Sequence, residues 1–167
     1  MKLKLFAMVI VLVNFLFITG CNNISYNAQL YDNINDYINE DFAKETIIRD
    51  VYYVNHDDIT IIQHDDTVPS DRTFIVTDKE SYDEMFNENI DYFDVNFTTQ
   101  MLIIYTFRAI NHRELNLTNI SLQDSSLTVE YKSIQKNGIG DTSTPYQRWI
   151  AVKLDKINIM SISFKQK

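Results

Sequence analysis

The stretch MLIIYTF, residues 101–107, is the most continuously apolar segment outside the N-terminal region of this 167-residue chain. A strand buried on one face alternates apolar and polar residues, whereas a strand covered on both faces is apolar almost throughout. The sequence therefore predicts that residues 101–107 form a central strand, covered on both faces.

Segments on either side of this strand are rich in branched and aromatic residues, which is typical of β-structure. IIRDVYYV (47–54) and ITIIQ (59–63) flank turn-forming residues and predict a hairpin. Leu127, Val129 and Tyr131 alternate like the inner face of a strand that follows a turn at Asp124–Ser126. The full set of expected strands is 47–54, 59–63, 73–77, 101–107, 115–122, 127–131, 147–154 and 158–165. Asp155 and Lys156 join the last two of these strands.

One of these strands contains a break in its alternation. Leu115 and Leu117 share one phase, whereas Ile120 and Leu122 share the other. Because side chains of a strand alternate with a period of two, both pairs can be buried only if the strand is locally shifted. We therefore expect a bulge or kink near Thr118–Asn119.

Two helices are expected. Apolar residues from Leu30 to Phe42 recur at helical spacing, which predicts a helix over residues 30–45, with a flexible stalk as the alternative. Thr77 and Glu80 form a capping box that opens a short helix from Asp78 to about residue 87, with Tyr82, Met85 and Phe86 on its inner face. Since helices and strands do not alternate regularly, the fold class is α+β: a mainly antiparallel sheet or part-closed barrel over residues 46–167.

The N-terminal region has the pattern of an export signal. Two lysines precede an apolar run over residues 5–18, which is too short to span a bilayer as a helix. The sequence Ile18-Thr19-Gly20-Cys21 resembles the lipobox of bacterial lipoproteins, which implies cleavage before Cys21 and attachment of diacylglycerol to its sulfur. The chain would then consist of a signal peptide (1–20), a tether (21–29) and the folded domain, anchored on the extracytoplasmic face of a bacterial membrane.

Composition excludes several classes of function. The formal net charge is −8, and removal of Lys2 and Lys4 with the signal would make the mature chain more acidic. An acidic surface repels phosphate backbones and anionic headgroups, so we expect no nucleic-acid partner and no membrane adhesion beyond the anchor. With Cys21 acylated, no other cysteine remains for a disulfide, a thiol nucleophile or a metal site.

No group of residues predicts catalysis, a cofactor or a bound metal. His56-Asp57-Asp58 and His64-Asp65-Asp66 resemble metal ligands, but they stand at opposite ends of an expected strand, on the order of 25 Å apart. We interpret them as solvated turns and His112 as an exposed residue at a strand end. We therefore expect no enzyme. Two alternatives remain open: a small secreted hydrolase that uses carboxylates or His56 and His64 with a metal, and a small-ligand sensor.

Two aromatic residues near the C-terminus are candidates for a protein interface, Trp149 and Tyr146. In RWIAVKLD (148–155), alternation places Ile150, Val152 and Leu154 on one face and Trp149 on the other, beside charged residues. An exposed tryptophan in such a setting is typical of a contact anchor. The alternative is that Trp149 packs under the loop 136–146.

From about Thr73 onward, the order of features resembles the PrcB-like family, a C-terminal domain found in proteins of protease complexes. The resemblance rests on the aromatic helix SYDEMF (81–86), the segment VNFTTQMLIIYTF (95–107), Pro-Tyr at 145–146 and the V-x-L strand at 152–154. Asn96 stands where the family usually has Asp. The resemblance implies an exported or lipid-anchored protein without catalytic residues, which binds a protein partner and supports or regulates a surface protease.

Overall fold

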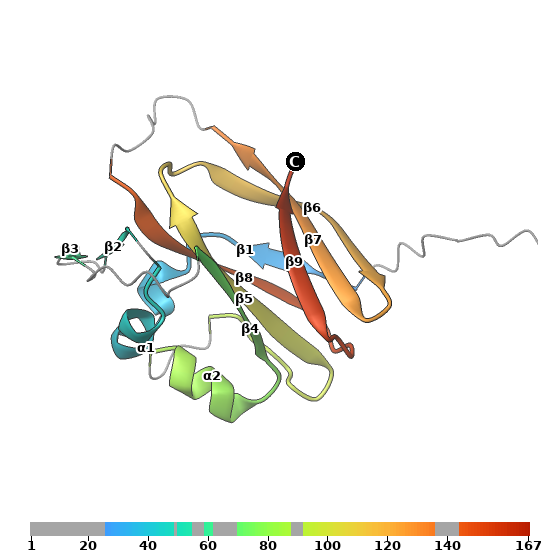
Figure 1. Cartoon of the computed structure of the whole chain (residues 1–167). Coiled ribbons are helices and arrows are strands. Elements are labelled where there is room, and N and C mark those ends of the chain that lie inside the picture. Colours follow the sequence, from blue (N-terminus) through green and yellow to red (C-terminus); the bar gives the residue numbers. More distant parts are fainter. Residues whose placement is uncertain (1–25, 49, 55–58, 62–69, 88–91, 136–143) are drawn as a thin grey trace, which may run out of the picture.

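The computed structural model describes residues 26–48, 50–54, 59–61, 70–87, 92–135 and 144–167. They form an α+β fold dominated by antiparallel strands (Figure 1). The helical elements are η1 (Asn35–Tyr37, a 3-10 turn), α1 (Glu40–Glu45) and α2 (Lys79–Met85). The strands are β1 (Gln29–Tyr31), β2 (Tyr52–Val54), β3 (Ile59–Ile61), β4 (Asp71–Val76), β5 (Gln100–Ala109), β6 (Glu114–Gln123), β7 (Ser126–Ile134), β8 (Tyr146–Asp155) and β9 (Ser161–Gln166).

The larger sheet has the order β3-β2-β8-β5-β4, and β1 pairs with β8 beside this path. β5 lies between β8 and β4, and residues 101–106 are all buried. The predicted central strand is therefore confirmed. The expected pairing of the segments around 52 and 61 is also confirmed, because β2 and β3 are antiparallel. The turn between them lies outside the described residues.

The smaller sheet has the order β6-β7-β9 and packs against one face of the larger sheet. The register of β6 against β7 shifts between Leu117 and Asn119, which confirms the predicted bulge. Leu115 and Ile120, on either side of the shift, are consequently both buried. β9 pairs in parallel with β7, so the last two strands belong to different sheets and do not form a hairpin.

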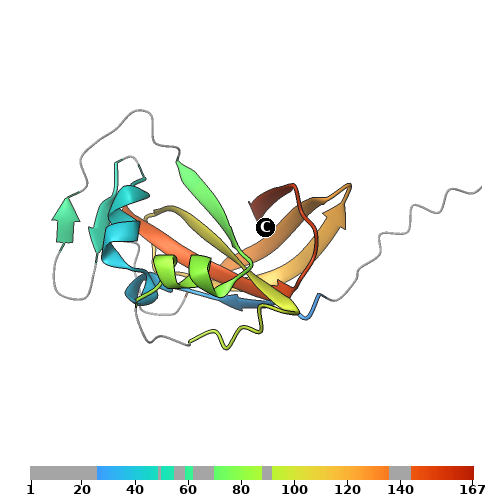
Figure 2. The same ribbon diagram turned by 90° about the horizontal axis from the view of Figure 1, so that it is seen from below.

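Each face of β8 contributes to a different hydrophobic layer. Ile150, Val152 and Leu154 pack toward the smaller sheet. Trp149 and Ala151 point to the other face, which α1, α2 and η1 cover (Figure 2). This arrangement confirms the predicted alternation and gives a three-layer molecule: helices, larger sheet, smaller sheet.

The expected helix over residues 30–45 is wrong in its first part. Residues 29–31 form β1, and α1 begins only after Asn39, whose side chain accepts hydrogen bonds from the N–H groups of Asp41 and Phe42. Asn33 has a left-handed backbone (φ 55°), which a continuous helix cannot accommodate. The chain instead pairs with the edge of β8, because strand pairing satisfies backbone groups there that would otherwise be buried without partners.

A side chain continues this pairing where β1 ends. The buried Asn35 donates through its amide nitrogen to the carbonyl of Gln147 at 2.6 Å. Its amide oxygen accepts the N–H of Trp149 at 3.0 Å. Asn35 thereby takes the position that a strand residue would hold against β8.

The tether is also shorter than expected. Tyr26 is buried, and its carbonyl accepts the N–H of Asp155 at 2.9 Å, so the folded domain already includes residue 26.

The predicted helix after β4 is confirmed as α2, with Tyr82, Met85 and Phe86 buried. The capping residue is Asp78 and not Thr77, since the Asp78 carboxylate accepts the N–H of Ser81 at 2.8 Å. This bond lowers the pKa of Asp78. Within the part of the chain that the structure describes, no helix has the length and apolar character needed to cross a bilayer.

Candidate functional site

A pocket of about 350 Å³ opens where β8 begins, and its walls come from three parts of the chain. The segment after β1 supplies two residues, the β5–β6 connection together with the first residue of β6 supplies two, and β8 supplies two. The lining residues are Asp32, Asn33, His112, Glu114, Tyr146 and Arg148.

Arg148 is the buried centre of this pocket. It has the same alternation phase as Ile150, so its side chain starts from the face that the smaller sheet covers, and only 4% of the side chain is exposed. One guanidinium nitrogen donates to Asp32 Oδ1 at 2.5 Å and to the carbonyl of Arg113 at 2.6 Å. The other terminal nitrogen reaches the carbonyl of Asn111 at 3.5 Å. Arg148 thus joins the β5–β6 connection to the segment after β1.

Asp32 completes this arrangement from the opposite side. Its second carboxylate oxygen accepts the N–H of Leu115 at 2.8 Å, and its side chain is 21% exposed. A buried arginine needs such a partner, because an uncompensated charge is costly away from water. The pair holds the start of β6 against the end of β1.

Two rings form the outer wall. Tyr146 is buried and donates its hydroxyl to the carbonyl of Asn111 at 2.9 Å. The exposed His112 stacks on it, with ring centroids 4.8 Å apart and an interplanar angle of 22°. Burial raises the pKa of the Tyr146 phenol, and the positive charge of Arg148 offsets part of that rise. The phenol therefore stays protonated at neutral pH and continues to donate its hydrogen bond.

The charges of the lining suit recognition of a polar group. Asp32 and Arg148 neutralise each other, and the lining also contains the carboxylate of Glu114. The stacked rings present an aromatic surface beside these carboxylates, a combination that fits a cationic side chain of a partner. Among the described residues, no group of three or more His, Cys, Asp or Glu side chains is placed to hold a metal ion.

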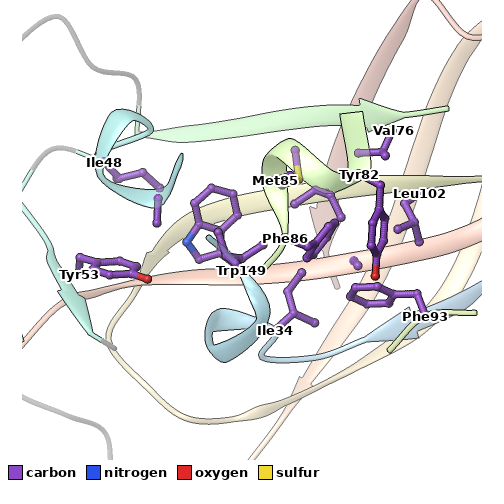
Figure 3. Packing of buried hydrophobic residues seen from close by; sticks show 14 of the residues in the cluster. Ile34, Ile48, Tyr53, Val76, Tyr82, Met85, Phe86, Phe93, Leu102 and Trp149 are labelled. Carbon is purple, nitrogen blue, oxygen red and sulfur yellow. The ribbon is translucent and has the colours of Figure 1, made fainter. Parts of the chain in front are cut away.

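The prediction that Trp149 is an exposed interface anchor is wrong. Its exposed fraction is 0%, and its ring lies 6.0 Å from that of Phe74 and 6.2 Å from that of Phe42. Figure 3 shows the indole within the core between the larger sheet and the helices, near Ile48, Tyr53 and Met85. Trp149 is packed, as the alternative had it, but α1 and β4 supply the ring contacts that the alternative assigned to the loop 136–146. Residues 136–143 of that loop lie outside the described residues.

The other sequence candidates are placed differently. Tyr146 is 8% exposed and so does not form an open contact surface, but it lines the pocket. His112 is exposed just before a strand, as predicted. Cys21 and both His-Asp-Asp triplets, with His56 and His64, lie outside the described residues.

Arg148 and Asp32 are absent from the sequence-based candidates. One signal pointed to the arginine: it has the alternation phase of three core residues in its own strand, so burial and an acidic partner were predictable. No local pattern identifies which of the many carboxylates pairs with it, because Asp32 lies 116 residues away. Comparison with protein-family models, curated proteins and solved structures gave no match.

Proposed function

We propose that this chain is a non-catalytic, lipid-anchored binding module on the extracytoplasmic face of a bacterial membrane. It supports or regulates a protein partner, for which the PrcB-like resemblance suggests a surface protease. The observation that carries the proposal is the ITGC motif at residues 18–21, placed directly after a lysine-flanked apolar run. Two acyl chains on Cys21 give stable anchoring, whereas one chain gives only marginal binding.

The pocket supports the binding part of the proposal. Arg148 and Asp32 hold each other and nearby backbone groups, which fixes the pocket wall. A preorganised wall reduces the entropy lost on association and so favours binding. Its stacked rings offer an aromatic surface for a cationic side chain of the partner.

The pocket also supports one alternative, a small-ligand sensor, because its volume falls within the range of small-molecule sites. The remaining alternative is a small secreted hydrolase that uses carboxylates, or His56 and His64, with a metal. Metal analysis of purified residues 22–167 separates this alternative from the others. Stoichiometric zinc or calcium would favour the hydrolase over a binding role.

Replacement of the anchor cysteine tests the membrane attachment. In bacteria, Cys21→Ser is expected to abolish incorporation of labelled fatty acid and to stop signal cleavage, because the thioether cannot form. The precursor should then be held only by its uncleaved apolar run. Wild-type mobility, labelling and fractionation of the variant would show that Cys21 is not the anchor.

Replacement of an exposed pocket residue tests the partner contact. His112→Ala is expected to weaken capture of the partner by the anchored protein in detergent-solubilised native membranes, with nearly unchanged thermal stability. The matched control is Lys132→Ala, an exposed change on the outer face of β7. Equal capture by both variants would remove the pocket from the interface.

A further inference from the structure

We propose that the folded domain rests end-on against the bilayer that holds its anchor, with the pocket directed away from the lipid. The end that faces the lipid, here named the anchor end, consists of Tyr26, the turn at 124–125 and the connection 156–160. This inference depends on the proposed lipidation of Cys21, and it adds an orientation to it: the anchor and its short tether, and not independent adhesion, keep the anchor end at the lipid.

The first step concerns reach. Tyr26 is 6% exposed and hydrogen-bonded to Asp155 through its backbone, and the side chain of Asn27 donates to the Asp155 carboxylate at 2.8 Å. Five residue steps therefore separate the lipidated Cys21 from the folded domain. Even a fully extended chain spans at most about 18 Å over five steps. The tether is shorter than the larger sheet is long, since the ten residues of β8 cover about 30 Å.

The second step concerns direction. β8 runs from Tyr146 at the pocket to Asp155 at the anchor end, and Arg148 lies seven residues, or about 23 Å, from Asp155. The start of β1, the β6–β7 turn and the connection from β8 to β9 lie at the same end of the molecule (Figure 1). From Tyr26 the chain enters β1 and runs away from this end. A tether attached here brings the anchor end to the lipid and leaves the pocket open to a partner.

The third step concerns surface chemistry. Met160, in the connection 156–160, is 84% exposed, more than any other large hydrophobic residue that the structure describes. Its N–H is fixed to the carbonyl of Ser125 at 2.8 Å, so the residue is held beside the β6–β7 turn. An exposed methionine of this kind fits the boundary between headgroups and acyl chains.

The helical face is less suited to lipid. Its two helices carry six acidic residues and two lysines, Lys44 and Lys79, which pair with Glu40 and Asp83. The remaining net negative charge is repelled by anionic headgroups. The acidic residues are Glu40, Asp41 and Glu45 on α1 and Glu80, Asp83 and Glu84 on α2. One methionine does not hold a protein on a bilayer, so it is the short tether that keeps the domain close to the lipid. The difference between the anchor end and the acidic helical face then selects the orientation.

Fluorescence quenching in vesicles tests the orientation on the intact lipoprotein. Cys21 is the only cysteine, and acylation blocks its sulfur, so an introduced cysteine can be labelled alone. Met160→Cys places a fluorophore at the anchor end. Ile134→Cys is the matched control: it is also exposed, at 47%, and lies at the far end of β7, eight residues or about 26 Å from Ser126. Each protein is reconstituted in vesicles with nitroxide-labelled lipids.

The expected result is loss of most of the fluorescence at position 160 and little loss at position 134. Insertion of ten Gly/Ser residues after Asn23 should reduce the quenching at position 160, because the tether then no longer enforces contact. Equal quenching at both positions, or stronger quenching at 134, in protein that floats with the vesicles would overturn the orientation alone. Failure of the protein to float, without a lipid adduct by mass spectrometry, would overturn the proposed lipidation itself and the orientation with it.

Discussion

Replacing Trp149 with alanine is expected to lower the free energy of unfolding by about 3–5 kcal/mol, because the indole is fully buried. It packs between α1 and β4, against Phe42 and Phe74, and its removal would leave a cavity that none of these elements can fill. In a domain near this size, about 1 kcal/mol moves the melting temperature by roughly 2–4 °C. The variant should therefore melt about 6–20 °C below the wild type in a circular-dichroism melt.

The matched control for this experiment is Met160→Ala, which truncates a large side chain that is almost fully exposed. Its melting temperature should stay close to that of the wild type. If Trp149→Ala melted with the control, the indole would not be part of the core, and the packing of the helical layer over the larger sheet would be wrong.

The position of Trp149 shows what alternation can and cannot predict. The phase was predicted correctly: Trp149 lies opposite Ile150. Its burial was not predictable from the strand, because its cover comes from α1, more than 100 residues earlier in the chain. The charged Lys153 on the same face suggested exposure, but this residue lies near the end of β8 and directs its ammonium group to the carbonyl of Phe93 at 2.9 Å. Long side chains accommodate partial burial in this way.

Residues 30–39 show the opposite case: two residues were correctly expected to be buried, but the conformation was wrong. Ile34 and Ile38 are buried, as the apolar spacing predicted. They reach the core from a 3-10 turn and an isolated β-bridge, because the edge of β8 needs backbone partners that a helix would not provide. The spacing of apolar residues in one segment contains no information about an unpaired strand edge elsewhere in the fold.

The strands around MLIIYTF were predictable because their patterns are local. The bulge in β6 followed from two residue pairs on the same strand, and the buried face of β7 followed from alternation. The pocket depends on contacts between distant segments, and the sequence contains many acidic residues that could have been the partner of a buried arginine.

The second large effect concerns this buried pair. Arg148→Met is expected to cost about 3–5 kcal/mol of unfolding free energy, because it removes the hydrogen bonds to Asp32 and to the Arg113 carbonyl and leaves the carboxylate without its cation. Urea unfolding at neutral pH measures the loss as a lower midpoint at unchanged slope. The matched control is Arg108→Met, an exposed arginine on β5, which should change stability by less than about 0.5 kcal/mol.

A double-mutant cycle then separates the attraction within the pair from the cost of burying one charge alone. Asp32→Ala should also be strongly destabilising, since it leaves the guanidinium, only 4% exposed, without a counterion. Because each single change leaves an unpaired charge, the double variant should cost clearly less than the two single losses added together. Strict additivity would mean that the two groups do not interact. A folded double variant that captures the partner as well as the wild type would show that neither Asp32 nor Arg148 is needed for capture, either as a contact or to shape the pocket wall.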